Sequence, residues 1–184
     1  MENKVAVVYR SKSGFTQKYA QWIAEAVNGD LINGKQAKLN DLLNYDTIVY
    51  GGGLYAGGIH GIKPMKRIFE KLKGKKLIVF WLGASPVREK TMNQIKNNNF
   101  TQDQQKSIRF FMLRGGFNYE LCTPFDRFLM SILKMKLKSA KNPDADQRGM
   151  LASYSHPMDF TNPKYIAPIV EYIKSDCGPD NNSL

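Results

Sequence analysis

Residues 5–16 read VAVVYRSKSGFT, and this stretch indicates how the chain begins to fold. Val5 to Val8 form a continuous apolar run, which is typical of a parallel strand covered on both faces. A short polar loop follows, and a helical pattern begins directly after it. The stretch therefore predicts a buried strand, a loop and a helix in succession.

The loop has the composition of an anion-binding site. Its hydroxyls can donate hydrogen bonds, its glycine permits a positive φ or a close approach, and the helix N-terminus adds partial positive charge. The predicted phosphate site comprises Ser11, Lys12, Ser13, Gly14, Phe15 and Thr16. The alternative is an ordinary turn whose hydroxyls only cap the helix, but capping explains one hydroxyl rather than three hydroxyls and a glycine.

The spacing of this loop excludes the commonest nucleotide motifs. It matches neither G-x-x-x-x-G-K-[ST] nor G-x-G-x-x-G, which argues against ATP and NAD. Read as Tyr-x-Ser-x-Ser-Gly-x-Thr after the first strand, the loop resembles the phosphate loop of flavodoxins. That resemblance implies that the loop binds the monophosphate of FMN.

A glycine-rich stretch follows the next strongly predicted strand, at residues 46–51. Five glycines fall within the eight residues 51–58, and Tyr55 lies among them. Because glycine weakens both helices and strands, we expect the backbone here to turn sharply or to approach another group closely. A flat ring lying on Tyr55 is one interpretation, and a flexible surface loop with a buried tyrosine is the other.

The rest of the chain alternates between strand and helix patterns. Strands are expected at residues 30–33, 76–82 and 108–113, and helices at residues 15–27, 39–43, 62–72, 101–107, 124–138 and 163–174. This alternation predicts an α/β flavodoxin-like fold, a five-stranded parallel sheet in the order 2-1-3-4-5 with helices on both faces. In that order the loops after the first, third and fourth strands meet at the carboxyl edge of the sheet.

The resemblance to flavodoxins also implies two loops that hold the flavin ring. The first is placed at Leu54, Tyr55, Ala56 and Gly57, with Tyr55 as the stacking residue, and the second, at the pyrimidine edge, at Gly83, Ala84, Ser85 and Arg88. The second loop departs from the family because it lacks the aromatic residue that usually covers the opposite flavin face. Phe117 or Tyr119 is the substitute we expect.

Within that family, residues 119–138 and 144–148 are similar to menaquinone-dependent protoporphyrinogen dehydrogenases. The shared features are an aromatic-rich stretch, a Phe-Asp-Arg-Phe segment at residues 125–128 and a helix rich in Met and Lys. The similarity implies an FMN-dependent oxidoreductase or electron carrier that serves a quinone, a porphyrinogen or a redox partner protein. No side chain is assigned a catalytic role, because the flavin carries the redox chemistry.

The composition of the chain limits the number of domains and the classes of partner. With 184 residues and 42% hydrophobic content, we expect a single domain over residues 1–176 and a frayed tail at residues 177–184. The 27 Lys and Arg against 16 Asp and Glu give a net charge of +11, which attracts polyanions, acidic proteins or anionic lipid. Nucleic acid is disfavoured because neither an RNA-binding aromatic motif nor zinc-finger spacing occurs. The alternative function is a flavin-free module that binds an acidic protein or nucleic acid.

Location and metal binding are the last expectations. The chain shows neither a leader pattern nor an apolar run of membrane-spanning length, so we expect a cytoplasmic protein. Its two cysteines and two histidines lack metal-ligand spacing, so no metal site is expected. The amphipathic pattern of Pro124–Lys138 predicts an apolar stripe packed on the sheet, with contact to an anionic membrane surface as the alternative.

Overall fold

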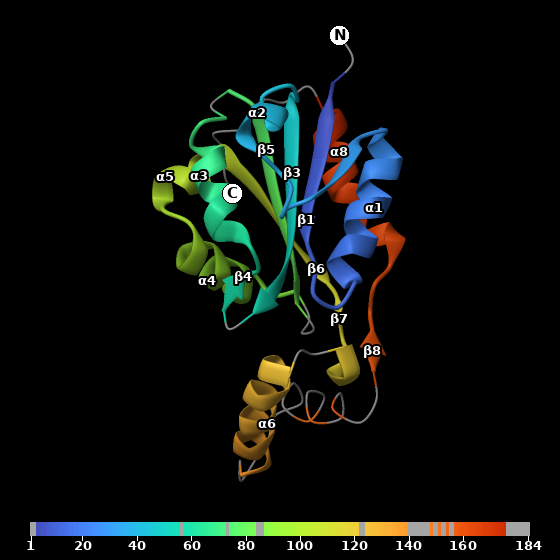
Figure 1. Ribbon diagram of the computed structural model, residues 1–184, viewed down its shortest axis with the longest axis vertical. Coiled ribbons are helices and arrows are strands. Elements are labelled where there is room, and N and C mark those ends of the chain that lie inside the picture. Colours follow the sequence, from blue (N-terminus) through green and yellow to red (C-terminus); the bar gives the residue numbers. More distant parts are fainter. Residues whose placement is uncertain are drawn as a thin grey trace.

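Strands and helices alternate along most of the chain (Figure 1). The computed structural model describes residues 3–55, 57–72, 74–83, 87–121, 124–139, 148, 151, 154 and 157–175. The strands among them are β1 (Val5–Arg10), β2 (Asp30–Asn33), β3 (Thr47–Tyr55), β4 (Gly58–Ile59), β5 (Lys76–Gly83), β6 (Ile108–Arg114), β7 (Gly116–Phe117) and β8 (Met158–Asp159).

Five of these strands form the central sheet. They run parallel in the order β2-β1-β3-β5-β6, which confirms the predicted 2-1-3-4-5 arrangement. The short strand β4 pairs antiparallel with the end of β3 and was not predicted. It turns the end of β3 into a hairpin at the carboxyl edge of the sheet.

Helices cover both faces of the sheet. The chain forms α1 (Phe15–Val27), α2 (Leu39–Leu42), α3 (Ile62–Phe69), α4 (Glu89–Asn99), α5 (Gln102–Ser107), η1 (Tyr119–Leu121), α6 (Pro124–Lys138), η2 (Pro163–Ile166) and α8 (Ala167–Lys174). Helices α1 and α8 lie together on one face, and α3, α4 and α5 lie on the other (Figure 1). The connections are therefore those of a doubly wound sheet.

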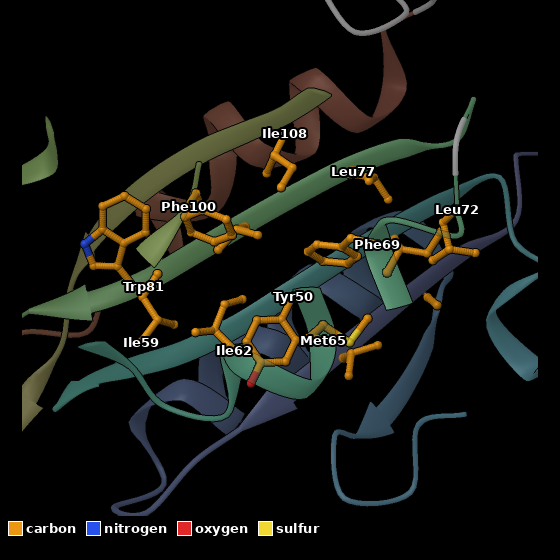
Figure 2. Close-up of a cluster of buried hydrophobic side chains, with 14 of the residues drawn as sticks. Tyr50, Ile59, Ile62, Met65, Phe69, Leu72, Leu77, Trp81, Phe100 and Ile108 are labelled. Atoms are coloured by element: carbon orange, nitrogen blue, oxygen red, sulfur yellow. The ribbon is translucent and has the colours of Figure 1, made fainter. Parts of the chain in front are cut away.

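Two apolar cores form between these layers, because alternate strand residues point to opposite faces. Figure 2 shows the core under α3, where Tyr50, Trp81 and Phe100 are among the buried residues. The other core joins the sheet to α1 and α8 through side chains that include Tyr19 and Phe80. Fully buried runs in β1, β3 and β5 explain why these three strands were the easiest to predict.

Three local predictions were wrong. The strand predicted to end at Gly51 continues as β3 to Tyr55, so Gly52 and Gly53 belong to it. The close approach that was also expected does occur, because the Phe80 ring and Ile59 fill the space that side chains would need at Gly51 and Gly52. Helix α4 was not predicted because its sequence is polar and its buried positions are few. Helix α3 ends at Phe69, earlier than the expected residue 72.

The segment between β6 and η2 is an insertion into the doubly wound pattern. It contains β7, α6 and β8 and projects beyond the carboxyl edge of the sheet (Figure 1). Helix α6 has the predicted bounds, but the prediction that its stripe packs on the sheet was wrong, since Phe128 and Ile132 are exposed. Among the described residues, no helix is both long and apolar enough to cross a bilayer.

Candidate functional site

The turn from Ser11 to Thr16 connects β1 to α1 at the carboxyl edge. Gly14 is the residue that precedes the helix, and its φ of 85° lies in the region that favours glycine. Among the described residues, no side chain caps α1, so the reading of these hydroxyls as helix caps is not supported. The Gly14 amide donates to Ser11 Oγ at 3.0 Å, which closes the turn on itself.

The glycine-rich stretch forms a hairpin rather than an open loop. Leu54 pairs with Ile59 and Tyr55 with Gly58, and the His60 amide donates to the Gly53 carbonyl at 2.9 Å. Tyr55 therefore lies at the last position of β3, next to the hairpin turn. Of the residues predicted for this ring loop, Ala56 lies outside the described part of the chain, and Gly57 has a φ of 78°.

A buried phenol supports the return strand of this hairpin. Tyr50 donates its hydroxyl to the His60 carbonyl at 2.7 Å. Burial raises the pKa of Tyr50 far above its usual range, and the charge of Arg10 lowers it only in part. The phenol therefore stays protonated at neutral pH and acts as a hydrogen-bond donor.

Asn99, at the end of α4, anchors the hairpin from the other side. Its Oδ1 accepts from the Ile59 amide at 3.1 Å, and its Nδ2 donates to the Gly57 carbonyl at 3.2 Å and to the Ile95 carbonyl at 2.9 Å. Because Asn99 is buried, its hydrogen bonds satisfy backbone and side-chain polar groups that water does not reach. Sequence reasoning missed this residue because nothing in the run Asn97 to Asn99 marks which asparagine faces inward.

Short distances join the three predicted loops. A methyl group placed on Gly53 would lie 3.7 Å from Thr16 Oγ1, so the turn at residues 11–16 lies against the base of the hairpin. The Lys12 ammonium lies 3.9 Å from the centroid of the Tyr55 ring. A methyl group placed on Gly83 would lie 3.7 Å from Leu54 Cδ1, which brings the end of β5 to the same place. The described ends of the three loops therefore meet.

The third loop is described only at its two ends. Gly83 ends β5, and Arg88 is exposed and precedes α4 in an extended conformation. Ala84 and Ser85 lie outside the described residues. Their predicted contact with the pyrimidine edge stays a prediction.

The two aromatic residues expected over the second flavin face pack within the insertion. The rings of Phe117 and Tyr119 lie 5.8 and 5.5 Å from the ring of Tyr154, centroid to centroid. Tyr154 donates its hydroxyl to the Met130 carbonyl of α6 at 2.8 Å. The cluster formed by these three rings therefore connects the base of the insertion to α6, and a role for Phe117 or Tyr119 over a flavin stays a prediction.

These residues fit a phosphorylated, flat ligand better than a metal ion. No group of three or more His, Cys, Asp or Glu side chains that could hold a metal occurs among the described residues. The turn instead offers main-chain amides at a helix N-terminus, with open space beside Gly14 where a Cβ would stand. Tyr55 offers an aromatic ring within reach of the same turn.

The parallel order β2-β1-β3-β5-β6, with a site at the switch between β1 and β3, defines a flavodoxin-like α/β protein. A model of the flavodoxin domain matches residues 6–144, so the chain belongs to the flavodoxin domain family. No curated protein matches the chain.

Solved structures similar to the chain include several flavodoxins. Two-electron reduced Megasphaera elsdenii flavodoxin is 20% identical over 59% of this chain and 84% of its own, with a TM-score of 0.44. A flavodoxin from the Archaea is 16% identical over 94% of this chain and 99% of its own, with a TM-score of 0.42. A Lactobacillus acidophilus flavoprotein in complex with FMN is 17% identical over 61% of this chain and 92% of its own, with a TM-score of 0.43.

Proposed function

We propose that the chain is an FMN-binding electron carrier or oxidoreductase. The observation that carries this proposal is the contact between the phosphate turn and the Tyr55 hairpin, through Lys12 over the Tyr55 ring and Thr16 beside Gly53. The turn at residues 11–16 would hold the phosphate, and Tyr55 would lie on the ring. FMN supplies one-electron and two-electron chemistry when bound. The protein supplies the donors, the ring contact and the charge around them.

Titration with FMN tests this proposal. We expect quenching of flavin fluorescence with one equivalent bound, and binding of riboflavin at least about a hundredfold weaker, because riboflavin lacks the phosphate that the amides and the helix N-terminus would hold. A protein that leaves FMN fluorescence unchanged would contradict it. Retention on an acidic protein or a polynucleotide, lost with salt and without flavin binding, would instead support the flavin-free binding module.

Replacement of Asn99 by Ala is expected to weaken FMN binding about tenfold and to lower the free energy of unfolding by about 1 to 3 kcal/mol. The change removes the hydrogen bonds that hold Gly57 and Ile59, so the hairpin loses its fixed position. Fluorescence titration and urea unfolding measure the two effects. Asn97→Ala is the control, because the Asn97 side chain accepts an exposed hydrogen bond from Gln105 and its loss should change neither quantity. Unchanged FMN affinity in Asn99→Ala would show that the hydrogen bonds from Asn99 to the hairpin are not needed for FMN binding.

The exposed cations next to the third loop are expected to favour reduced FMN. Arg88 and Lys90 are exposed at the start of α4, and reduced FMN carries negative charge on its pyrimidine side. The double change to Glu should lower the affinity for fully reduced FMN about threefold relative to that for the semiquinone. This lowers the one-electron potential between the two states by about 30 mV, at about 59 mV per tenfold. Spectroelectrochemical titration measures it. The control is Lys38→Glu with Lys174→Glu, which changes the net charge by the same amount at other exposed positions. This double variant should leave the flavin potential unchanged.

The partner proposed for the flavin is a quinone, a porphyrinogen or a redox protein. What supports the first two is the similarity of residues 119–138 to the protoporphyrinogen dehydrogenases. In the described part of that segment, Arg127 Nη2 donates to the Glu120 carbonyl at 2.6 Å and so joins α6 to η1. Reduced, FMN-loaded protein that is reoxidised by menaquinone, and turnover of a porphyrinogen with the quinone as acceptor, are the expected results. If menaquinone does not reoxidise the reduced protein and no porphyrinogen is oxidised, a redox protein is the remaining partner.

A second role, docking on an anionic membrane surface, is proposed for α6. Phe128, Ile132 and Met135 follow one another at helical spacing and are 61%, 45% and 65% exposed. Lys134 and Lys138 lie in the same helix and suit anionic headgroups, while Leu137 is 9% exposed and points elsewhere. Membrane contact at this end of the sheet would bring a lipid-soluble quinone near the candidate flavin site.

Vesicle sedimentation tests the docking role. We expect binding to vesicles with anionic lipid, weak binding to neutral ones, and at least a tenfold loss when Phe128 and Met135 are both replaced by Asp. Leu31→Asp with Leu43→Asp is the matched control, since these leucines are also exposed but lie far along the chain, in β2 and after α2. Equal loss in both double variants would contradict a specific role for α6.

A further inference from the structure

The insertion is closed at its base by its own two ends. Gly116 and Phe117 pair with Asp159 and Met158, and the Phe160 amide donates to the Gly115 carbonyl at 3.1 Å. We call residues 115–117 and 158–162 the stem. Whatever fixes the stem fixes the point from which α6 projects.

Tyr19 of α1 contacts the chain at both ends of the stem with one hydroxyl. The Tyr19 hydroxyl donates to the Arg114 carbonyl at 2.8 Å, where the chain enters the insertion, and accepts from the Asn162 amide at 3.1 Å, where the chain returns. The Tyr19 side chain is fully buried. The buried hydroxyl therefore holds together the Arg114 carbonyl and the Asn162 amide, which are 48 positions apart in the sequence.

Lys18 and Phe15 hold the stem from the same end of α1. Lys18 Nζ donates to Asp159 Oδ2 at 3.2 Å and to Thr161 Oγ1 at 2.8 Å. Partial burial acts to raise the pKa of Asp159, but the hydrogen bonds from Thr161 and Lys18 outweigh it and lower that pKa below its usual value. The carboxylate therefore stays ionised, and the contact persists, well below neutral pH. A methyl group on Gly116 would lie 2.6 Å from the Phe15 ring, so this ring packs directly on the stem.

All three contacts come from the first turns of the helix whose N-terminus is the proposed phosphate site. We infer that Tyr19, aided by Lys18, is a positioning residue that couples FMN binding to the stem of the insertion. This inference rests on the proposed function. A phosphate bound at residues 11–16 would order the first turn of α1, and that turn carries the stem; by linkage, an ordered stem would tighten FMN binding by the same factor.

Hydrogen exchange of the full chain tests the coupling. Amides of residues 115–121 and 158–162 are followed in the free protein, with saturating FMN and with saturating riboflavin. FMN is expected to slow their exchange at least fivefold, and riboflavin less than twofold, because riboflavin has no phosphate to order the turn. In Tyr19→Phe, FMN should still bind but should slow the stem less than twofold.

Two further variants keep the test decisive. Lys18→Met alters an exposed side chain, folds whether or not Tyr19→Phe does, and should reduce the FMN effect at least by half. Tyr45→Phe is the control: its hydroxyl donates to Asp30 Oδ2 at 2.8 Å, away from the stem, so the full FMN effect should remain. FMN binding without any slowing in the wild type, equal slowing by riboflavin, or full slowing in Lys18→Met would each overturn the coupling alone. Absence of FMN binding would overturn both the coupling and the proposed function.

Discussion

Gly14→Ala is expected to weaken FMN binding by at least about tenfold, since each charge-assisted hydrogen bond that an amide loses is worth about 1.5 to 3 kcal/mol. Gly14 has a φ of 85°, a conformation that costs a residue with a Cβ about 1 to 2 kcal/mol. The turn relieves that strain by moving, and the amides that move are those proposed to hold the phosphate. Fluorescence titration with FMN, alongside urea unfolding, measures the change.

Gly74→Ala is the matched control for this prediction. Gly74 has a φ of 83°, and a Cβ there meets no atom within 4 Å, as is also true of Gly14. The two substitutions therefore impose the same backbone strain and should lower the free energy of unfolding alike. Only Gly14→Ala should affect FMN. Equal FMN affinities in the two variants would show that the turn does not hold the phosphate.

Gly51→Ala is expected to destabilise the fold by about 3 kcal/mol, the upper end of the usual cost of overpacking. Gly51 lies in the middle of β3, and a Cβ there would approach the Phe80 ring to 2.2 Å. Phe80 is fully buried, so its ring cannot move aside without disturbing the core under α1 and α8. Urea unfolding followed by circular dichroism measures the loss.

Gly53→Ala, two residues further along the same strand, provides the comparison. The nearest atom to a Cβ at Gly53 is Thr16 Oγ1 at 3.7 Å, an ordinary contact distance. Its free energy of unfolding should change by less than about 1 kcal/mol. Similar losses in the two variants would contradict the explanation that Phe80 requires a glycine at position 51.

Much of the fold was predictable because its signals are local. The runs at Val5–Arg10 and Lys76–Gly83 are apolar along nearly their whole length, and such runs become buried strands whatever surrounds them. The spacing of the apolar residues within 15–27 indicates helix α1, in which Tyr19 and Ile23 are buried and Ala26 is exposed. Right-handed crossovers then leave few possible orders for five strands.

The candidate site was predictable only in part. The phosphate turn and Tyr55 carry a recognisable pattern of residues, but the β3–β4 hairpin and Asn99 do not. The strand was expected to end at Gly51 because glycine weakens strands on average, whereas β3 continues through Gly52 and Gly53. The Phe80 ring and Ile59 occupy the space that a side chain would fill at Gly51 and Gly52. The anchoring role of Asn99 depends on where the end of α4 lies relative to the hairpin.

The sequence by itself determined the five strands of the central sheet and the turn at residues 11–16, because each follows from residues that are neighbours in the chain. The handedness of the crossovers then left few orders for these five strands. Only the tertiary structure decided that Phe128 and Ile132 of α6 are exposed and that Tyr19 holds both ends of the insertion. An amphipathic pattern indicates that one face of a helix is apolar, but not which surface packs against that face. Contacts between distant segments form only once the sheet has placed them side by side.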